Sequence, residues 1–277
     1  MIALTLFGLA GLLTTAIASC IHDTQLHARD LVERAVPTFG YTGEKGPLGW
    51  ARIDPVANKV CATGKAQSPI NIDGSIPKLT TKATKPEPLW EDIERTKFKN
   101  IGTAVEVEAE GTLKYGGREW ELNQFHFHTP SEHRIFEEHF PLEMHMVHSR
   151  KDDTSKKLVL GLTFELSDNG FTTTDLIQKL FNKVGAIATP HSEVTVGPVR
   201  FKEIKDAVAN SDVYKYAGSL TTPPCSEVVT WLVVAKPLPL DVKSYNRVKD
   251  VVKFNSRYTQ NTLGKENLLQ YASRFFD

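Results

Sequence analysis

The chain has 277 residues, of which 40% are hydrophobic and 24% are charged, and its formal net charge is +0. This length suits one large domain or two small ones with an ample core. The composition is that of an ordinary soluble globular protein. Basic and acidic residues balance at 33 each, so no cationic excess is available for phosphate groups and a nucleic-acid partner is not expected.

The N-terminal segment differs in composition from the rest. Ile2 to Ile17 is almost wholly apolar and small residues follow it, which is typical of a secretory signal peptide. We expect a signal peptide over residues 1–19, cleaved near Ala18–Cys20, and a secreted mature protein without a membrane span. A short membrane anchor is one alternative. A bacterial lipidation site at Cys20 is another.

Downstream of the leader, residues 20–38 are expected to form a polar tail and residues 39–277 the folded domain. A Gly- and Pro-rich loop region over residues 40–77 comes first. Short strands are then expected at spacings typical of an antiparallel sheet, over residues 104–110, 112–115, 120–128, 142–149, 158–166 and 227–235. Apolar periodicity predicts helices over 171–184, with Thr174 as N-cap and Gly185 past its end, and over 241–254.

Six of the nine histidines lie between His126 and His148. Because side chains alternate along a strand, one face of the first strand is expected to carry Trp120, Leu122, Gln124, His126 and His128. In the second strand, Glu143, His145 and Val147 share a face. Placed side by side, the two strands bring three imidazoles together, which is the ligand set of a catalytic zinc site. A surface pair or a hydrogen-bonded core pair of histidines is the alternative.

Several motifs between Phe39 and Gln270 resemble those of the α-class carbonic anhydrases of the secreted type, in the same order. The matching stretches are AQSPINID (66–73), QFHFH (124–128), SEH (131–133), EMHMVH (143–148), GSLTTPP (218–224), the strand of Trp231, and NSR (255–257). The resemblance implies reversible hydration of carbon dioxide to bicarbonate and a proton, by attack of zinc-bound hydroxide. It also implies an α+β fold dominated by β structure: one domain around a large, mostly antiparallel twisted sheet with a few short surface helices.

By this resemblance, Zn²⁺ is the cofactor and its ligands are His126, His128 and His145. The groups expected to orient these three rings are, in the same order, Gln124, the backbone carbonyl of Asn255, and Glu143. Three neutral imidazoles leave the charge of the ion undiminished. Zinc then lowers the pKa of a bound water to about 7, a value established for this same family.

The resemblance also assigns the rest of the site. Thr221 would accept a hydrogen bond from the hydroxide and donate one to Glu132, which aims the hydroxide at the substrate. Carbon dioxide is nearly apolar and needs an apolar wall. The expected pocket residues are Val147, Val159, Leu220, Thr222, Val229 and Trp231. Tyr41 would belong to a water network, and His133 with Tyr216 to a buried structural network. A plain turn is the alternative reading of residues 221–224.

The cysteine count suggests one disulfide. Cys20 lies at the expected cleavage site, so Cys61 and Cys225 remain as an even pair in a secreted chain. Two separate buried thiols are the alternative. The resemblance favours the bridge, because secreted members of the family tie the loop that carries Thr221 to an N-terminal cysteine.

The chain departs from the family pattern at four positions. Thr103 stands where fast members carry a proton-shuttling histidine, and a threonine cannot accept a proton near neutral pH. Glu106 replaces a common neutral amide, Thr129 a frequent tryptophan, and Tyr258 a frequent proline. The first departure puts high turnover in doubt, although none of them removes zinc chemistry.

Two other functions remain open on the sequence. A cupin-type protein would use Glu132 as a ligand to iron or manganese, but the glycines of that motif are absent. A non-catalytic binding module would have lost ligands, whereas all three histidines and the Glu132–Thr221 pair are present. A small-molecule substrate and a monomer or homodimer are expected.

Overall fold

The structure is a computed structural model, and it describes residues 39–275. The expected signal peptide and tail, Cys20 among them, lie outside the described residues. Within residues 39–275, no helix is both long and apolar enough to cross a membrane.

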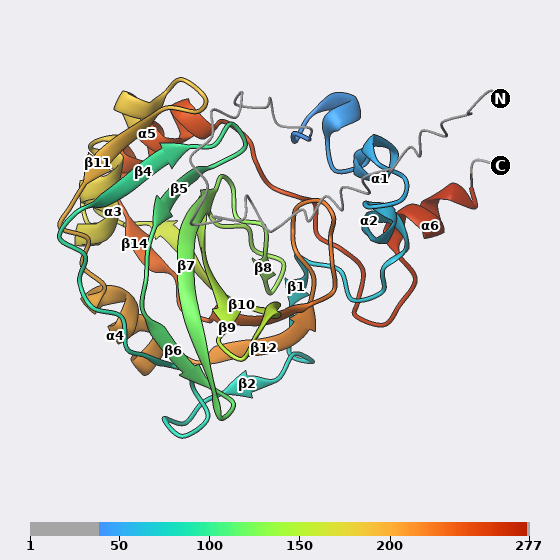
Figure 1. Cartoon of the computed structure of the whole chain (residues 1–277), viewed down its shortest axis with the longest axis horizontal. Helices are drawn as coiled ribbons and strands as arrows, with labels where there is room; N and C mark the ends of the chain where they lie inside the picture. The colour runs from blue at the N-terminus through green and yellow to red at the C-terminus, as the bar shows by residue number, and fades with distance from the viewer. Residues whose placement is uncertain (1–38, 276–277) are drawn as a thin grey trace, which may run out of the picture.

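A twisted sheet of 12 strands forms the centre of the molecule (Figure 1). Its main path runs through β11 (Glu193–Val196), β4 (Thr96–Asn100), β5 (Val105–Glu108), β7 (Arg118–His128), β9 (Leu142–Arg150), β10 (Asp153–Leu166), β13 (Val229–Val234), β12 (Val213–Gly218) and β2 (Lys78–Leu79). Off this path lie β6 (Thr112–Tyr115) beside β7, β3 (Glu87–Pro88) beside β6, and β14 (Leu238–Leu240) beside β10. A separate pair joins β1 (Asn71–Ile72) to β8 (Arg134–Ile135). In the large sheet, only the pairs of β10 with β13 and β14 are parallel, which confirms the expected mostly antiparallel architecture.

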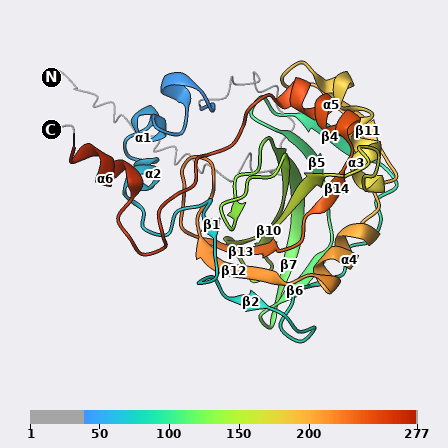
Figure 2. The ribbon, with the colours of Figure 1, turned by 180° about the vertical axis from the view of Figure 1, so that it is seen from behind.

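Few helices accompany the sheet, as expected for an α+β fold dominated by strands. Three of them, α3 (Asp175–Phe181), α4 (Lys202–Asn210) and α5 (Val242–Val252), lie along one side of it in both views (Figures 1 and 2). The short helices α1 (Trp50–Ile53), α2 (Lys59–Thr63) and α6 (Leu268–Ser273) gather away from these three, toward the ends of the chain. The sequence did not predict β1 to β4, β8, β11, β12 and β14, nor helices α1, α2, α4 and α6. Helices α1 and α2 and strand β1 lie within residues 40–77, which were expected to form only a loop region.

The two predicted helices exist but are shorter than their apolar patterns. Thr174 caps α3, its side chain accepting a hydrogen bond from the Ile177 amide at 3.2 Å. The helix ends at Phe181 with Asn182 as C-cap, so Gly185 does not follow its end as predicted. Gly185 instead lies inside a 3₁₀ turn over Val184–Ile187.

The larger hydrophobic core lies between the sheet and helices α3, α4 and α5. Phe125 and Phe127 of β7 project into it, and the Phe127 ring meets Phe181 of α3 at a centroid distance of 4.9 Å. Burying a large apolar side chain of this kind stabilises a fold by roughly 1.5–3 kcal/mol. This core fixes one face of β7 and β9, and the opposite face is left for the histidines.

The prediction that Trp120 and Leu122 share a strand face with His126 and His128 is wrong. The register of β7 against β9 shifts between Leu122 and Gln124, so the extra residue Asn123 forms a β-bulge. Because one extra residue reverses the alternation, Trp120 and Leu122 join the core that contains Phe125. Only the stretch after the bulge has the predicted alternation.

Candidate metal centre

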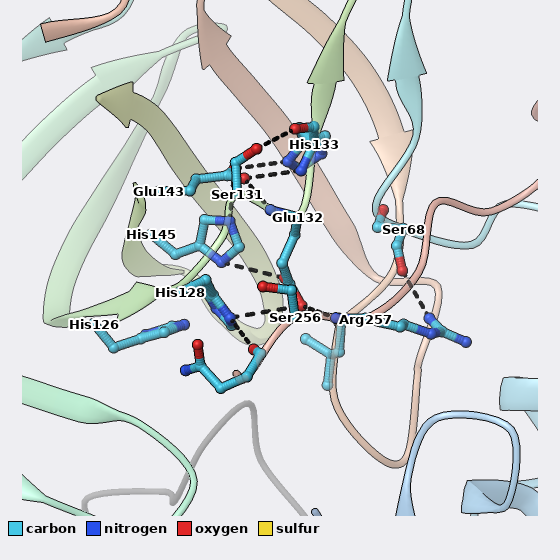
Figure 3. Close-up of polar contacts among 12 residues, drawn as sticks. Ser68, His126, His128, Ser131, Glu132, His133, Glu143, His145, Ser256 and Arg257 are labelled. Carbon is cyan, nitrogen blue, oxygen red and sulfur yellow. Dashed lines mark hydrogen bonds and ion pairs between the residues drawn. The ribbon is translucent and has the colours of Figure 1, made fainter. Parts of the chain in front are cut away.

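Two neighbouring strands carry the histidine cluster. His126 and His128 belong to β7 and His145 to β9, and His126 pairs directly with His145 in the register. One ring nitrogen from each residue lies within 4.8 Å of the others. The three rings lie next to one another, with centroids 4.5–5.4 Å apart, and are almost completely buried (Figure 3).

A hydrogen bond holds the second nitrogen of each ring. Nδ1 of His126 lies 2.9 Å from Oε1 of Gln124, and Nδ1 of His128 lies 2.8 Å from the Asn255 carbonyl oxygen. Nε2 of His145 lies 2.8 Å from Oε1 of Glu143. These partners are the three expected from the sequence. Such acceptors fix the tautomer and orientation of metal-binding histidines.

The residues fit a zinc ion. Burial lowers the pKa of all three imidazoles, to about 4 for His128, so the rings are neutral near pH 7. Neutral imidazoles are zinc ligands. Nε2 of His128 is buried and has no hydrogen-bond partner in the described part of the chain. A bound cation would supply the missing partner, because an orphaned buried nitrogen is costly.

Glu143 connects His145 to a buried polar network. Its Oε1 also lies 2.7 Å from Nδ1 of His133, and its Oε2 accepts two backbone N–H groups at 2.8 Å. Burial raises the pKa of the Glu143 carboxyl, but His133 and His145 outweigh it and hold that pKa well below its ordinary range. The network continues from Nε2 of His133 to the Tyr216 hydroxyl at 2.6 Å, and from there to Ser68 at 2.9 Å.

Glu132 lies beside the histidines with its carboxylate fully buried (Figure 3). Its Oε1 accepts the Arg257 backbone N–H at 2.8 Å. Burial raises the pKa of Glu132 to about 7, although the neighbouring His145, the Arg257 amide and the Thr221 hydroxyl each act to lower that pKa. The structure therefore brings Thr221 close to the Glu132 carboxylate.

The predicted apolar pocket residues lie together. Val147, Val159, Leu220, Val229 and Trp231 belong to one buried cluster on the histidine face of the sheet. The Trp231 ring lies 4.8 Å from the His145 ring. Thr222 is 1% exposed and its hydroxyl has no partner among residues 39–275.

Cys61 and Cys225 form a disulfide, across a sequence separation of 164 residues. Both are fully buried and pack against Trp50. The Gln67 side chain donates to the Cys225 carbonyl at 3.0 Å. The bridge therefore fixes the end of the loop that carries Thr221.

Of the remaining predicted positions, Tyr41 lies near the disulfide, and Thr103 and Glu106 lie next to the histidine cluster. Tyr41 packs edge-on against Trp50 at a centroid distance of 5.8 Å. Thr103 is buried, and its carbonyl accepts a hydrogen bond from the Asn255 side chain at 3.2 Å. Glu106 faces His126 across β5 and β7 and is 2% exposed. Burial raises the pKa of the Glu106 carboxyl to about 8.

Sequence reasoning missed two supporting roles, that of Gly161 and that of the Asn255 side chain. Gly161 pairs with His145, and a Cβ atom there would lie 3.2 Å from Oε1 of Glu143, so its hydrogen atom leaves room for the carboxylate. A lone glycine in a strand of apolar residues was the available signal. The Asn255 side chain also hydrogen-bonds to the backbones of Thr129, Phe127 and Thr103. An asparagine in the sequence does not by itself indicate such a bridging role.

Glu132 takes no part in the candidate ligand groups of the described residues, which are His126 with His128 and His145, and His133 with Glu143 and His145. The cupin-type ligand set, which requires Glu132, is therefore not formed.

Known proteins resemble the chain in sequence and in fold. The profile of the eukaryotic-type carbonic anhydrases matches residues 45–270. A carbonic anhydrase of Neisseria gonorrhoeae is 33% identical over 79% of this chain and 78% of its own length. Alpha carbonic anhydrase 4 of Arabidopsis thaliana is 30% identical over 86% of this chain and 88% of its own length. A solved fungal alpha carbonic anhydrase from Aspergillus oryzae superposes with a TM-score of 0.81 at 40% identity, covering 85% of this chain and 98% of that one. The chain belongs to the eukaryotic-type, or α, carbonic anhydrase family, whose members are lyases that hydrate carbon dioxide.

Proposed function

We propose that the chain hydrates carbon dioxide reversibly at a zinc centre held by His126, His128 and His145. The observation that carries this proposal is the approach of three neutral, pre-oriented ring nitrogens within 4.8 Å. When bound, zinc would act as a Lewis acid that lowers the pKa of water to about 7 and so supplies a nucleophile at neutral pH. The protein supplies orientation and a surface for the substrate.

Thr221 and Glu132 orient the attacking oxygen in this proposal. Glu132 uses Oε1 to accept the Arg257 N–H, while its Oε2 has no partner within hydrogen-bond geometry in the described chain. This open Oε2 is the acceptor that we assign to the nearby Thr221 hydroxyl, whose oxygen then accepts a hydrogen bond from the nucleophile. This arrangement selects one lone pair of the nucleophile for the reaction with carbon dioxide.

The apolar cluster around Trp231 holds the substrate. Val147, Val159 and Leu220 are each at most 4% exposed, and carbon dioxide offers no charge for a polar wall to recognise. Bicarbonate is charged and more strongly hydrated, so the same wall favours its release. We infer that Leu220 and Thr222, on the loop after β12, lie at the substrate.

We also propose that the protein is secreted as a monomer or homodimer after removal of residues 1–19. The Cys61–Cys225 disulfide supports an oxidising compartment, extracellular or periplasmic. The chain carries no cationic excess, which supports a small molecule rather than nucleic acid as its partner.

Stopped-flow hydration assays with zinc-loaded and metal-free protein test the proposal. We expect activity only in the zinc-loaded protein, at one zinc per chain. An aromatic sulfonamide should abolish it, since an α-carbonic anhydrase of Thermovibrio ammonificans, 29% identical, has been solved with sulfanilamide. Zinc-loaded protein without activity would point to the binding-module alternative, and a requirement for iron would contradict the zinc assignment.

A further inference from the structure

Arg257 is an arginine buried in the protein interior. It is 1% exposed, and its guanidinium carbon lies over the Trp50 ring, 5.5 Å from the ring centroid. Burial lowers the pKa of this guanidinium to about 10, so the group keeps its charge at neutral pH. A buried charge is costly unless it is hydrogen-bonded. The partners of Arg257 therefore show what this residue holds in place.

The backbone of Arg257 fixes Glu132. Its N–H donates to Oε1 of Glu132 at 2.8 Å, and the carbonyl of Asn255, two residues earlier, meets Nδ1 of His128. Both belong to a stretch, residues 253–262, that forms neither helix nor strand. Such a stretch has no regular ladder of backbone hydrogen bonds, so its position depends more strongly on the anchoring of its side chains.

The guanidinium of Arg257 anchors this stretch to residues 61–68. Nη1 donates to the Ser68 carbonyl at 2.7 Å, and Nη2 donates to Oε1 of Gln67 at 2.9 Å. A longer contact of 3.3 Å joins Nη2 to the carbonyl of Cys61. In Figure 3 the guanidinium points toward Ser68, whereas Glu132 lies at the backbone of Arg257. One residue thus connects Glu132 with residues 61–68.

The same segment holds both ends of the loop that carries Thr221. At one end, the Ser68 amide donates to Oγ of Ser219 at 2.9 Å, and the Ser219 amide donates to Oγ of Ser68 at 3.0 Å. At the other end, the Gln67 side chain donates to the Cys225 carbonyl at 3.0 Å, and the disulfide ties Cys225 to the segment as well. Because Thr221 lies between Ser219 and Cys225, the acceptors of the guanidinium are residues that fix this loop.

We propose that Arg257 is a positioning residue for the Thr221–Glu132 pair. Its backbone holds Glu132, and its side chain holds the segment to which the Thr221 loop is attached. Without the guanidinium donors, the two members of the pair can shift relative to each other. The catalytic consequence rests on the orienting role proposed above for this pair. Arg257 itself belongs to neither group of described residues that could hold a metal.

A double-mutant cycle on the zinc-loaded protein tests this proposal. Arg257→Met keeps the length of the side chain and removes its donors. It should lower kcat/KM for hydration about tenfold or more at unchanged zinc content, because a displacement of about 1 Å in a site can cost about 10² in rate. In a Thr221→Ala background the same change should cost less than about twofold, since the pair is already broken. Arg257→Lys keeps one charged donor and should recover part of the rate.

Two further variants separate positioning from a general loss of stability. Gln67→Leu cuts the link between the guanidinium and the Cys225 carbonyl while the arginine stays. It should lower kcat/KM in the natural chain but not in Thr221→Ala, and it takes the place of Arg257→Met if that variant does not fold. Thr174→Ala removes the N-cap of α3, outside the site. It should lower the stability to urea and leave kcat/KM unchanged in both backgrounds.

Crystal structures of the natural chain and of Arg257→Met, or of Gln67→Leu, give a readout that does not depend on activity. The Thr221 hydroxyl should lie within hydrogen-bond distance of Glu132 in the natural chain and beyond it in the variant. Equal losses of kcat/KM in both backgrounds, or an unchanged Thr221–Glu132 pair in the variant crystal, would overturn the positioning role. A natural chain without zinc-dependent hydration would instead contradict the proposed function, and the crystal structures would still decide whether Arg257 positions the pair.

Discussion

Oε1 of Glu143 lies 2.8 Å from Nε2 of His145, which leaves Nδ1 of His145 to face the other two histidines. His126 and His128 have the opposite arrangement, because their Nδ1 atoms are held by Gln124 and by the Asn255 carbonyl. The cluster thus presents two Nε2 atoms and one Nδ1 atom. The position of one buried carboxylate decides which nitrogen of His145 is available.

We predict that His145→Ala abolishes both tight zinc binding and hydration, because two imidazoles cannot complete the ligand set. Zinc content after dialysis against a chelator and stopped-flow rates measure the two effects. His191→Asn is a suitable control, since asparagine tolerates the positive φ of 66° at that position. Its zinc content should stay near one per chain. Full activity in His145→Ala would remove this residue from the ligand set.

Residues of the site that are positioned by strand alternation could be predicted from the sequence. Residues whose position depends on a β-bulge or on a contact between distant segments could not. Strand alternation was enough to place Gln124, His126 and His128 on one face of β7. The same rule failed at Trp120, because the bulge at Asn123 reverses the faces and no residue type marks a bulge reliably. The approach of Thr221 to Glu132 joins a loop to a segment 89 positions earlier, so periodicity could not reveal it and only the resemblance did.

Thr221→Ala should slow hydration while zinc content stays near one per chain. The reason is that the Thr221 hydroxyl lies beside Glu132, and Thr221 belongs to neither group of described residues that could hold a metal. By analogy with the loss of an oxyanion-hole donor, the rate should fall by about 10²–10³. Thr221→Ser keeps the hydroxyl and should recover most of the rate. A rate in Thr221→Ala equal to that of the natural chain would reject the orienting role.

Removing the Cys61–Cys225 bridge should destabilise the fold. The disulfide closes a loop of 164 residues, and losing such a bridge typically costs about 2–5 kcal/mol. Urea unfolding of the Cys61→Ser, Cys225→Ser double variant against the oxidised natural chain measures the difference in the free energy of unfolding. Non-reducing peptide mapping of the secreted protein checks the pairing. Free thiols in folded, active material would contradict it.

The buried His148 should make the fold sensitive to acid. Its ring packs on Trp90 at a centroid distance of 5.6 Å and is fully buried. Burial lowers its pKa from 6.5 to about 4. Between these two values the unfolded chain binds a proton that the folded chain does not, so stability falls as the pH drops from 6.5 to 4. The full loss is about 3 kcal/mol.

Urea unfolding at several pH values between 7 and 4 tests this contribution, using the natural chain and His148→Gln. The variant is expected to be less stable at pH 7, because glutamine does not reproduce the stack on Trp90. Its free energy of unfolding should nevertheless decline less steeply below pH 6.5. Parallel pH curves for the two proteins would show that His148 does not carry the acid sensitivity.

Thr103 leads to the last prediction. Each turnover releases a proton from the site to solvent, and Thr103 has no group that accepts a proton near neutral pH. Proton transfer should therefore limit the rate at low buffer concentration. Added imidazole should raise kcat and leave kcat/KM nearly fixed, because the buffer acts after the chemical step.

Thr103→His should raise kcat at low buffer, since a group with a pKa near 6.5 can both take up and release the proton. Thr103→Asn, similar in polarity but unable to titrate, is the control and should not. If kcat at low buffer responds neither to imidazole nor to Thr103→His, another group carries the proton, and Glu106, facing His126 across β5 and β7, is the next residue to replace.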